Sequence, residues 1–170
     1  MTANLISLSR IILIFPIIIC IGNSDLYLAL LFFLLASFTD FLDGYFARYL
    51  KQESILGANL DLLADKIFVS SLLIFISFHF DNLIFLAMTI LIIARELSIG
   101  SIRQYLLETK KKNKIKVNFL GKFKTFFHIL SIGIAIIFLD TELSFLADIT
   151  IVLSAILSWI SLLNYSYAKN

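Results

Sequence analysis

Cysteine is nearly absent from this chain of 170 residues, and charged residues are few. The single cysteine, Cys20, excludes an intrachain disulfide framework and a zinc site built from several cysteines. Charged residues make up only 15% of the chain, whereas 60% of it is hydrophobic and the mean hydropathy is +0.97. Soluble globular domains are roughly half apolar, so the composition excludes an ordinary soluble globule and favours a membrane protein.

The chain also lacks internal repeats and low-complexity linkers, and its length suits a single domain over residues 1–170. A separate signal peptide is not expected. The first apolar run follows Arg10 directly, has no small-residue cleavage site and is followed by further apolar runs. We therefore expect this run to be a retained first helix.

Six apolar runs are present, and a helix that spans a bilayer needs about 20 such residues. The sequence therefore predicts an all-α polytopic membrane protein with six transmembrane helices. Their expected bounds are Leu5–Ile21, Leu26–Arg48, Ala58–Phe80, Leu83–Leu107, Phe119–Leu139 and Leu143–Leu163.

The charges divide between the two sides of this predicted bundle. All 14 lysines and arginines fall on or near the side that holds both termini, including the lysine run at 110–116. The other side carries only acids: Asp25, Asp81, Asp140, Glu142 and Asp148. The positive-inside rule then predicts that both termini are cytoplasmic. We interpret the lysine run as a determinant of topology that also attracts anionic lipid headgroups. Nucleic-acid binding is a poorer interpretation, because the run is not part of a basic fold that carries aromatic residues.

Four aspartates accompany the second and third apolar runs, where a carboxylate costs roughly 2.5–3.5 kcal/mol on insertion scales. They are Asp40, Asp43, Asp61 and Asp65, in the frame D-x2-D-G-x2-A-R-x8-G-x3-D-x3-D. Packed carboxylates repel one another, and divalent cations remove that repulsion. Oxygen ligands without histidine or cysteine favour Mg²⁺, Mn²⁺ or Ca²⁺ over zinc, and four carboxylates balance two such ions.

Helical spacing places these acids on two stripes. Asp43, Gly44 and Ala47 follow Asp40 by three, four and seven residues, and Asp61 and Asp65 follow Gly57 by four and eight. A short turn between the two helices predicts antiparallel neighbours, so the four carboxylates are expected at one depth near the cytoplasmic end. The alternative is that they are helix-end acids paired with Arg48, Lys51 and Lys66.

A second polar group lies in the fourth and fifth runs. Arg95 and Arg103 occur in ILIIARELSIGSIRQYLLE, and Lys122 lies near the start of the fifth helix. Arginine inside a membrane helix should face a polar cavity or an anion, and a guanidinium binds phosphate in bidentate fashion. We therefore predict an acceptor that carries a phosphate. Alternatively, Arg95 pairs with its neighbour Glu96 or extends its charged end toward the membrane surface, and Lys122 is a charge that sets topology.

Three further residues have simpler interpretations. Lys124 is best explained as a charge that sets topology. His79 is expected at the outer surface. His128, two turns into the fifth helix, is expected to have a hydrogen-bonded packing role rather than a catalytic one.

The segment DFLDGYFARYLKQESILGANLDLLAD, from Asp40 to Asp65, resembles the signature of the CDP-alcohol phosphotransferases, with every defined position filled. The resemblance implies a six-span membrane enzyme that transfers a substituted phosphate from a CDP-linked donor to an alcohol. It further implies two metals, Mg²⁺ or Mn²⁺, bound by the four aspartates, with Asp65 as the base. Gly44, Ala47, Arg48 and Gly57 would then line the cytidine diphosphate.

Three other stretches, NLISLSR, ARELSIGSIR and LGKFKT, are similar to those of the bacterial phosphatidylglycerophosphate synthases within that family. This likeness implies CDP-diacylglycerol as donor, glycerol 3-phosphate as acceptor, CMP as product, a homodimer, and a bacterial cytoplasmic membrane with the site facing the cytoplasm. It places Asn4 and Arg10 near the nucleotide or its diphosphate. It places Arg95, Arg103 and Lys122 near glycerol phosphate.

Two alternatives stay open. The same chemistry could use inositol phosphate, serine or phosphatidylglycerol as acceptor. A divalent-cation transporter would be a different class, but its polar groups should lie on both sides of the midplane rather than at one end.

Overall fold

The computed structural model describes the backbone of residues 2–50, 55–108, 119–138 and 141–167, and the side chains of 8–39, 57, 59–102, 104, 123–138 and 141–163. Within these ranges the regular structure is entirely helical. The helices are α1 (Thr2–Gly22), α2 (Leu26–Leu50), α3 (Ile55–His79), α4 (Leu83–Glu108), α5 (Phe119–Phe138) and α6 (Phe145–Tyr167). Each begins and ends within four residues of a predicted run, so the predicted helices are confirmed.

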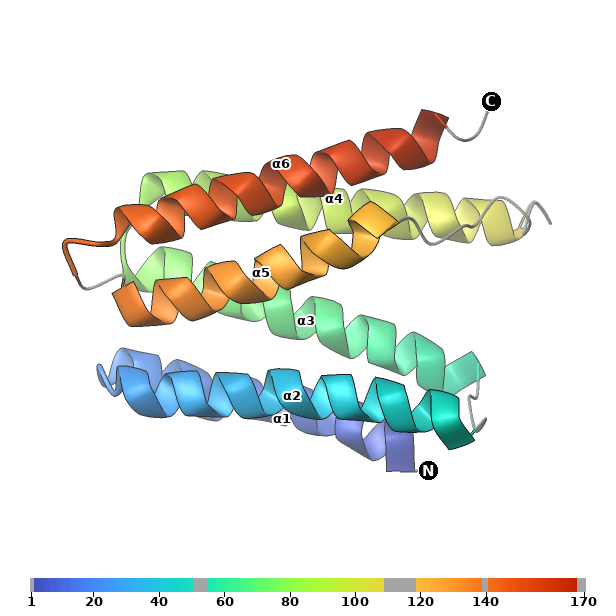
Figure 1. The fold of residues 1–170 in the computed structure, drawn as a ribbon, viewed down its shortest axis with the longest axis horizontal. Helices are drawn as coiled ribbons and strands as arrows, with labels where there is room; N and C mark the ends of the chain where they lie inside the picture. Colours follow the sequence, from blue (N-terminus) through green and yellow to red (C-terminus); the bar gives the residue numbers. More distant parts are fainter. Residues whose placement is uncertain (1, 51–54, 109–118, 139–140, 168–170) are drawn as a thin grey trace.

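The six helices form one elongated bundle in which neighbours close a ring (Figure 1). α1 packs against α2 and α3, α3 against α4, α4 against α6, α6 against α5, and α5 against α2. An additional contact joins α3 to α5 across the ring. Because α1 lies against both α2 and α3, the first helix supports the two helices that carry the acidic frame.

Both chain ends lie at the same end of the bundle, together with the end of α2, the start of α3, the end of α4 and the start of α5 (Figure 1). The other three connections lie at the far end. Two of them contain a non-glycine residue with left-handed backbone, Ser24 (φ 61°) and Asp81 (φ 46°), a conformation that ends a right-handed helix. This arrangement matches the relative placement of the termini that the sequence predicts.

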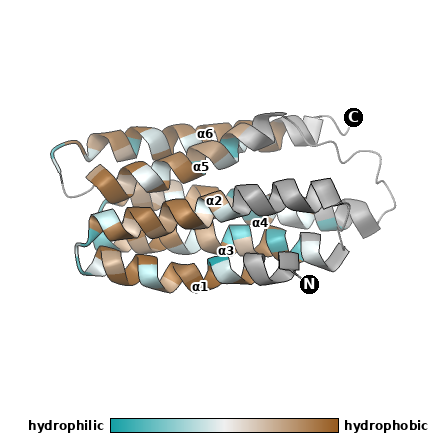
Figure 2. Cartoon of the chain, turned by 60° about the horizontal axis from the view of Figure 1, so that its bottom comes forward, coloured by the Kyte–Doolittle hydropathy of each residue, from teal (hydrophilic) through white to brown (hydrophobic). Residues whose placement is uncertain are grey.

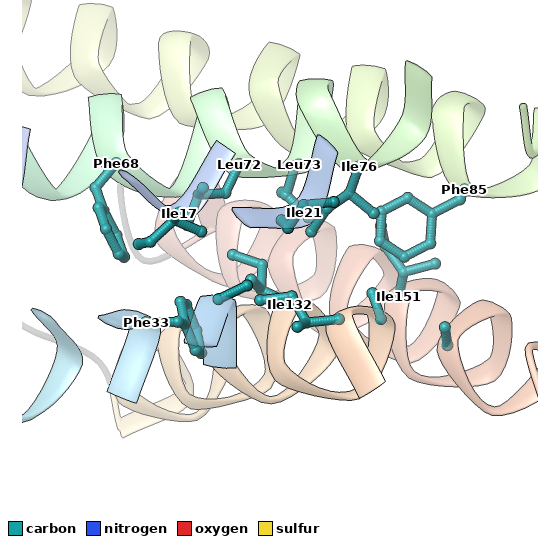
Figure 3. Close-up of a cluster of buried hydrophobic side chains, with 14 of the residues drawn as sticks. Ile17, Ile21, Phe33, Phe68, Leu72, Leu73, Ile76, Phe85, Ile132 and Ile151 are labelled. Atoms are coloured by element: carbon teal, nitrogen blue, oxygen red, sulfur yellow. The ribbon is translucent and has the colours of Figure 1, made fainter. Parts of the chain in front are cut away.

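The centre of the bundle is a continuous apolar core to which all six helices contribute (Figure 3). Phe33 of α2 stacks on Phe68 of α3, with ring centroids 6.0 Å apart. Gly133 of α5 faces the same ring, because a Cβ at that position would lie 3.6 Å from Cε1 of Phe33. Tight packing here fixes how α2, α3 and α5 sit relative to one another.

Most of the coloured part of the chain is hydrophobic (Figure 2), and the outer surface of the bundle is apolar as well as the core. Large hydrophobic side chains are exposed on every helix, for example Phe15, Phe38, Phe78, Leu97, Phe126 and Ile156. Conversely, several polar side chains are buried, among them Arg10, Arg95, His128 and Ser154. An apolar exterior of this extent indicates a surface made to contact something other than water.

The lengths of the apolar stretches also indicate contact with a membrane. Two stretches among the described residues are long and apolar enough to cross a membrane, Leu83–Ile102 in α4 and Phe145–Leu163 in α6. Shorter apolar stretches occupy Leu8–Gly22, Leu26–Thr39 and Phe123–Phe138. These lengths support two membrane-spanning helices among the described residues, and the prediction of six spans stays a prediction.

Candidate active site

The described part of the acidic frame lies on α3, within a few turns of the end that holds the termini. Asp61 and Asp65 are four residues apart and so share one face of the helix, one turn beyond the buried Gly57. Both carboxylates are partly buried, and the side chain of Asp61 is 48% exposed. The face they share is therefore polar and accessible in a bundle whose surface is otherwise mostly apolar.

The other half of the frame lies on α2. The side chains of Asp40, Asp43, Gly44, Ala47 and Arg48 are outside the part of the chain that the structure describes. Their helix does constrain where they can be. α2 ends at Leu50 and α3 begins at Ile55, so the two ends are no more than about 18 Å apart.

Asp43 and Asp61 lie at similar distances from this connection. Asp43 is seven residues before the end of α2, and Asp61 is six residues after the start of α3, or about 9–11 Å along each helix. This is compatible with four carboxylates at one depth, and their convergence stays a prediction.

Arg10 connects α1 to this acidic face. Its side chain is almost completely buried, and Nη2 donates to Oδ1 of Asp61, 51 residues away in the sequence. A buried guanidinium needs a partner of opposite charge, and this contact provides one. The structure thus brings to the acidic frame a residue that the family resemblance placed near the diphosphate. The side chain of Asn4 lies outside the described residues.

Arg95, predicted to bind the acceptor's phosphate, is buried between α4 and α6. Its Nε donates to the backbone oxygen of Ser158 at 2.9 Å, and its Nη2 donates to Oγ of Ser161 at 3.3 Å. Its Nη1 donates to Oε1 of Glu96 at 2.7 Å. Three of the five N–H donors of a guanidinium therefore have partners inside the protein. The alternative interpretation, that Arg95 pairs with Glu96, is confirmed as a contact, and Arg95 also ties α4 to α6.

Lys124 is placed differently from what its sequence position suggests. We expected a charge that sets topology, but its ammonium lies inside the bundle and donates to Oε1 of Glu96. The side chains are only 12% exposed for Lys124 and 14% for Glu96. Sequence reasoning gave Glu96 no functional role of its own, although a carboxylate within an apolar run was the available signal.

Lys66 extends this polar group to α3. It directly follows Asp65 in the chain, and its Nζ donates to the backbone oxygen of Glu96 at 3.1 Å. A Cβ on Gly100, one turn further along α4, would come within 3.3 Å of the same Nζ, so the absence of a side chain there leaves room for the ammonium. The backbone of α4 is thus linked to the helix that carries the candidate base.

His128 has the packing role that the sequence predicts. It is buried, and its Nδ1 is hydrogen-bonded to Oγ of Ser154 on α6. His79 is exposed and is the last residue of α3, which ends at the opposite end of the bundle (Figure 1), as expected. The side chains of Arg103 and Lys122 lie outside the described residues, so their predicted contact with the acceptor stays a prediction.

The donor atoms on α3 suit a hard divalent cation. Asp61 and Asp65 offer carboxylate oxygens with no histidine or cysteine among the neighbours described, which fits Mg²⁺ or Mn²⁺ better than zinc. Among the described side chains, no group of three or more acids, histidines or cysteines could hold a metal ion. The predicted set of four also includes Asp40 and Asp43, whose side chains lie outside the described residues.

Comparison with known proteins identifies the family of this chain. The family model of CDP-alcohol phosphatidyltransferase matches residues 1–163. A protein of Wigglesworthia glossinidia brevipalpis, named CDP-diacylglycerol–glycerol-3-phosphate 3-phosphatidyltransferase, is 35% identical over 147 residues, which is 86% of this chain and 80% of the relative. Proteins of the same name from Haemophilus influenzae and Sodalis glossinidius are 34% and 33% identical, covering 84% and 81% of this chain and 77% and 76% of the relatives.

The chain therefore belongs to the CDP-alcohol phosphatidyltransferase family. It is an enzyme of phospholipid biosynthesis, and members of this family generally depend on a divalent metal. Its long apolar helices and apolar exterior agree with membrane association.

Proposed function

We propose that this protein transfers the phosphatidyl group of CDP-diacylglycerol to sn-glycerol 3-phosphate, giving phosphatidylglycerophosphate and CMP. The proposal rests above all on relatives of that name, which match this chain over about four-fifths of their own length. The contact of Arg10 with Asp61 supports it, because it joins the N-terminal helix to the acidic frame that the family signature defines.

In this proposal the nucleotide lies across the ends of α1, α2 and α3. Arg10 faces the diphosphate, while Asn4, Gly44, Ala47, Arg48 and Gly57 line the cytidine diphosphate. Asp40, Asp43, Asp61 and Asp65 would hold two divalent ions. When bound, such ions neutralise negative charge on phosphate oxygens. The small residues at 44, 47 and 57 leave space for a ligand beside the helix backbones.

The reaction is an in-line displacement at phosphorus. The 1-hydroxyl oxygen of glycerol 3-phosphate forms a bond to the phosphorus that carries diacylglycerol, and the bond from that phosphorus to the oxygen of CMP breaks. Asp65 accepts the proton of the attacking hydroxyl as a general base. CMP leaves with the electron pair of the broken bond.

The acceptor's own phosphate would be bound by Arg95, Arg103 and Lys122. Arg95 retains two N–H donors beyond its three contacts with described residues, and it lies at the level of Glu96 and Lys124 inside the bundle. A cationic group of this kind favours a phosphorylated acceptor over serine. Inositol phosphate and phosphatidylglycerol also carry phosphate and are the acceptors to compare.

We further propose six transmembrane spans in a bacterial cytoplasmic membrane, with both termini and the site on the cytoplasmic side and residues 1–170 forming one domain. The apolar exterior of all six helices and the acid-bearing connections at the far end support this orientation. A homodimer and contacts with anionic lipids complete the proposal.

CMP release tests the function directly. Purified protein in detergent would receive CDP-diacylglycerol, Mg²⁺ and one of four acceptors: glycerol 3-phosphate, inositol phosphate, serine or phosphatidylglycerol. We expect CMP release with glycerol 3-phosphate and its loss in Asp61→Asn. The matched control is Asp81→Asn, at an exposed position at the far end of the bundle. The backbone of Asp81 is left-handed, and asparagine tolerates that conformation. Preference for another acceptor, or full activity of Asp61→Asn, would contradict the proposal.

A further inference from the structure

Glu96 lies where α3, α5 and α6 approach α4. Its Oε1 accepts hydrogen bonds from Nη1 of Arg95 and from Nζ of Lys124 on α5. Its backbone oxygen accepts one from Nζ of Lys66 on α3. Arg95 in turn bonds to two residues of α6. Residues 95 and 96 together therefore connect four of the six helices through polar contacts.

The two cations that share the carboxylate depend on it to different degrees. Arg95 has further partners in the backbone oxygen of Ser158 and the hydroxyl of Ser161. For Lys124, Glu96 is the single hydrogen-bond partner among the residues whose side chains are described. A lysine ammonium sits on a flexible four-carbon stem and readily extends toward water. Glu96 is therefore what holds Lys124 inside the bundle.

This group has more positive than negative charge. Lys66, Arg95 and Lys124 bring three positive charges to Glu96, which touches two of them with its side chain and the third with its backbone. In a site of low exposure, an excess of positive charge favours binding of an additional anion. A phosphate monoester is an anion of suitable charge, and the proposed acceptor carries one.

We infer that Glu96 is a positioning residue for the acceptor's phosphate: it holds the Lys124 ammonium beside the Arg95 guanidinium so that both cations are in place before glycerol 3-phosphate arrives. The inference rests on the proposed function. It concerns a residue that contacts the cations rather than the substrate. Pre-ordering of this kind lowers the cost of binding, because the lysine side chain is already immobilised.

Electrostatic repulsion alone predicts the opposite effect on acceptor binding. A carboxylate beside two cations could compete with the phosphate, and its removal would then tighten acceptor binding. The burial of Lys124 favours positioning, because this lysine has no second described partner to keep it in the bundle when Glu96 is lost. The two effects predict KM changes of opposite sign, so one measurement separates them.

The test compares KM for glycerol 3-phosphate with KM for CDP-diacylglycerol in Glu96→Gln, Glu96→Asp and the double variant Glu96→Gln/Lys124→Met. Ser98→Ala is the matched control, because that exposed hydroxyl bonds to the backbone oxygen of Ala94 on its own helix. We expect Glu96→Gln to raise KM for glycerol 3-phosphate about tenfold or more and to leave KM for CDP-diacylglycerol within about twofold. Glu96→Asp, which keeps the charge, should recover part of the loss.

The double variant keeps the test decisive if Glu96→Gln folds poorly, because it removes the unpaired ammonium together with the carboxylate. Its KM for glycerol 3-phosphate should be raised by about as much as in Glu96→Gln alone, since both changes act through one contact. A fall in that KM, or equal changes in both KM values, would overturn the inference. A wild-type protein that releases no CMP with glycerol 3-phosphate would refute the proposed function, and this inference with it. An active wild type with unaffected variants would refute the inference alone.

Discussion

Arg95 offers a quantitative test of how the bundle is held together, through the substitution Arg95→Lys. The guanidinium reaches the backbone oxygen of Ser158, the hydroxyl of Ser161 and the carboxylate of Glu96 with three different nitrogens. A lysine ammonium is a single point and can keep at most one or two of these contacts. Losing two hydrogen bonds at about 1 kcal/mol each lowers the free energy of unfolding by about 2 kcal/mol. For a chain of this size that corresponds to a fall in Tm of roughly 4–8 °C.

Trp159 makes this change observable, because it is the only tryptophan in the chain. Its Nε1 donates to the backbone oxygen of Leu91 at 3.2 Å, which places it on the contact between α6 and α4, one turn of α4 away from Arg95. Thermal unfolding in detergent, followed by Trp159 fluorescence, should show the lower Tm together with a shifted emission maximum in the folded variant.

Ser101→Ala is the control for this experiment, since the Ser101 hydroxyl is exposed and bonds to the Leu97 oxygen of its own helix. It should leave both Tm and emission unchanged. If Arg95→Lys also unfolds at the wild-type temperature with unchanged emission, then Arg95 does not tie α4 to α6.

Two further predictions concern the metal and the core. Removal of divalent ions with EDTA should abolish CMP release. Mg²⁺ or Mn²⁺ should restore the activity and Zn²⁺ should not, because the predicted ligands are carboxylates. Activity that survives chelation would contradict the metal assignment. Phe33→Ala should lower the free energy of unfolding by about 3–5 kcal/mol, because a buried ring stacked on Phe68 leaves a cavity. Phe38→Ala, on the same helix but 58% exposed, should cost less than about 1 kcal/mol, and similar losses in the two variants would show that Phe33 is not a core residue.

The positions of the helices could be predicted because they depend on local composition. Runs such as Leu26–Arg48 and Leu83–Leu107 are mostly apolar, begin directly after Asp25 and Asn82, and are followed within a few residues by lysine and glutamate. A polar backbone in an apolar environment must satisfy its own hydrogen bonds, and for a single run of residues the helix does so. The observed α2 and α4 accordingly match these runs to within two residues.

The contacts of the charged residues could be predicted less well. Periodicity places Asp61 and Asp65 on one face of a helix but does not say which helix that face meets. The meeting of Asp61 with Arg10 across 51 residues depends on α1 packing against α3. Lys124 shows the same limitation, because its sequence position fits a topology charge, and only the approach of α5 to α4 turns it inward to Glu96.

The sequence by itself was enough to predict the class of chemistry, because one short segment holds four acids and their glycines at fixed helical offsets, and spacing along a helix is a local property. The tertiary structure decided which cation meets which carboxylate. Arg10 contacts Asp61, and Lys124 and Arg95 contact Glu96. These pairings arise from how apolar faces pack into a ring of helices. Such packing depends on shape complementarity among residues far apart in the chain, which spacing along one helix does not specify.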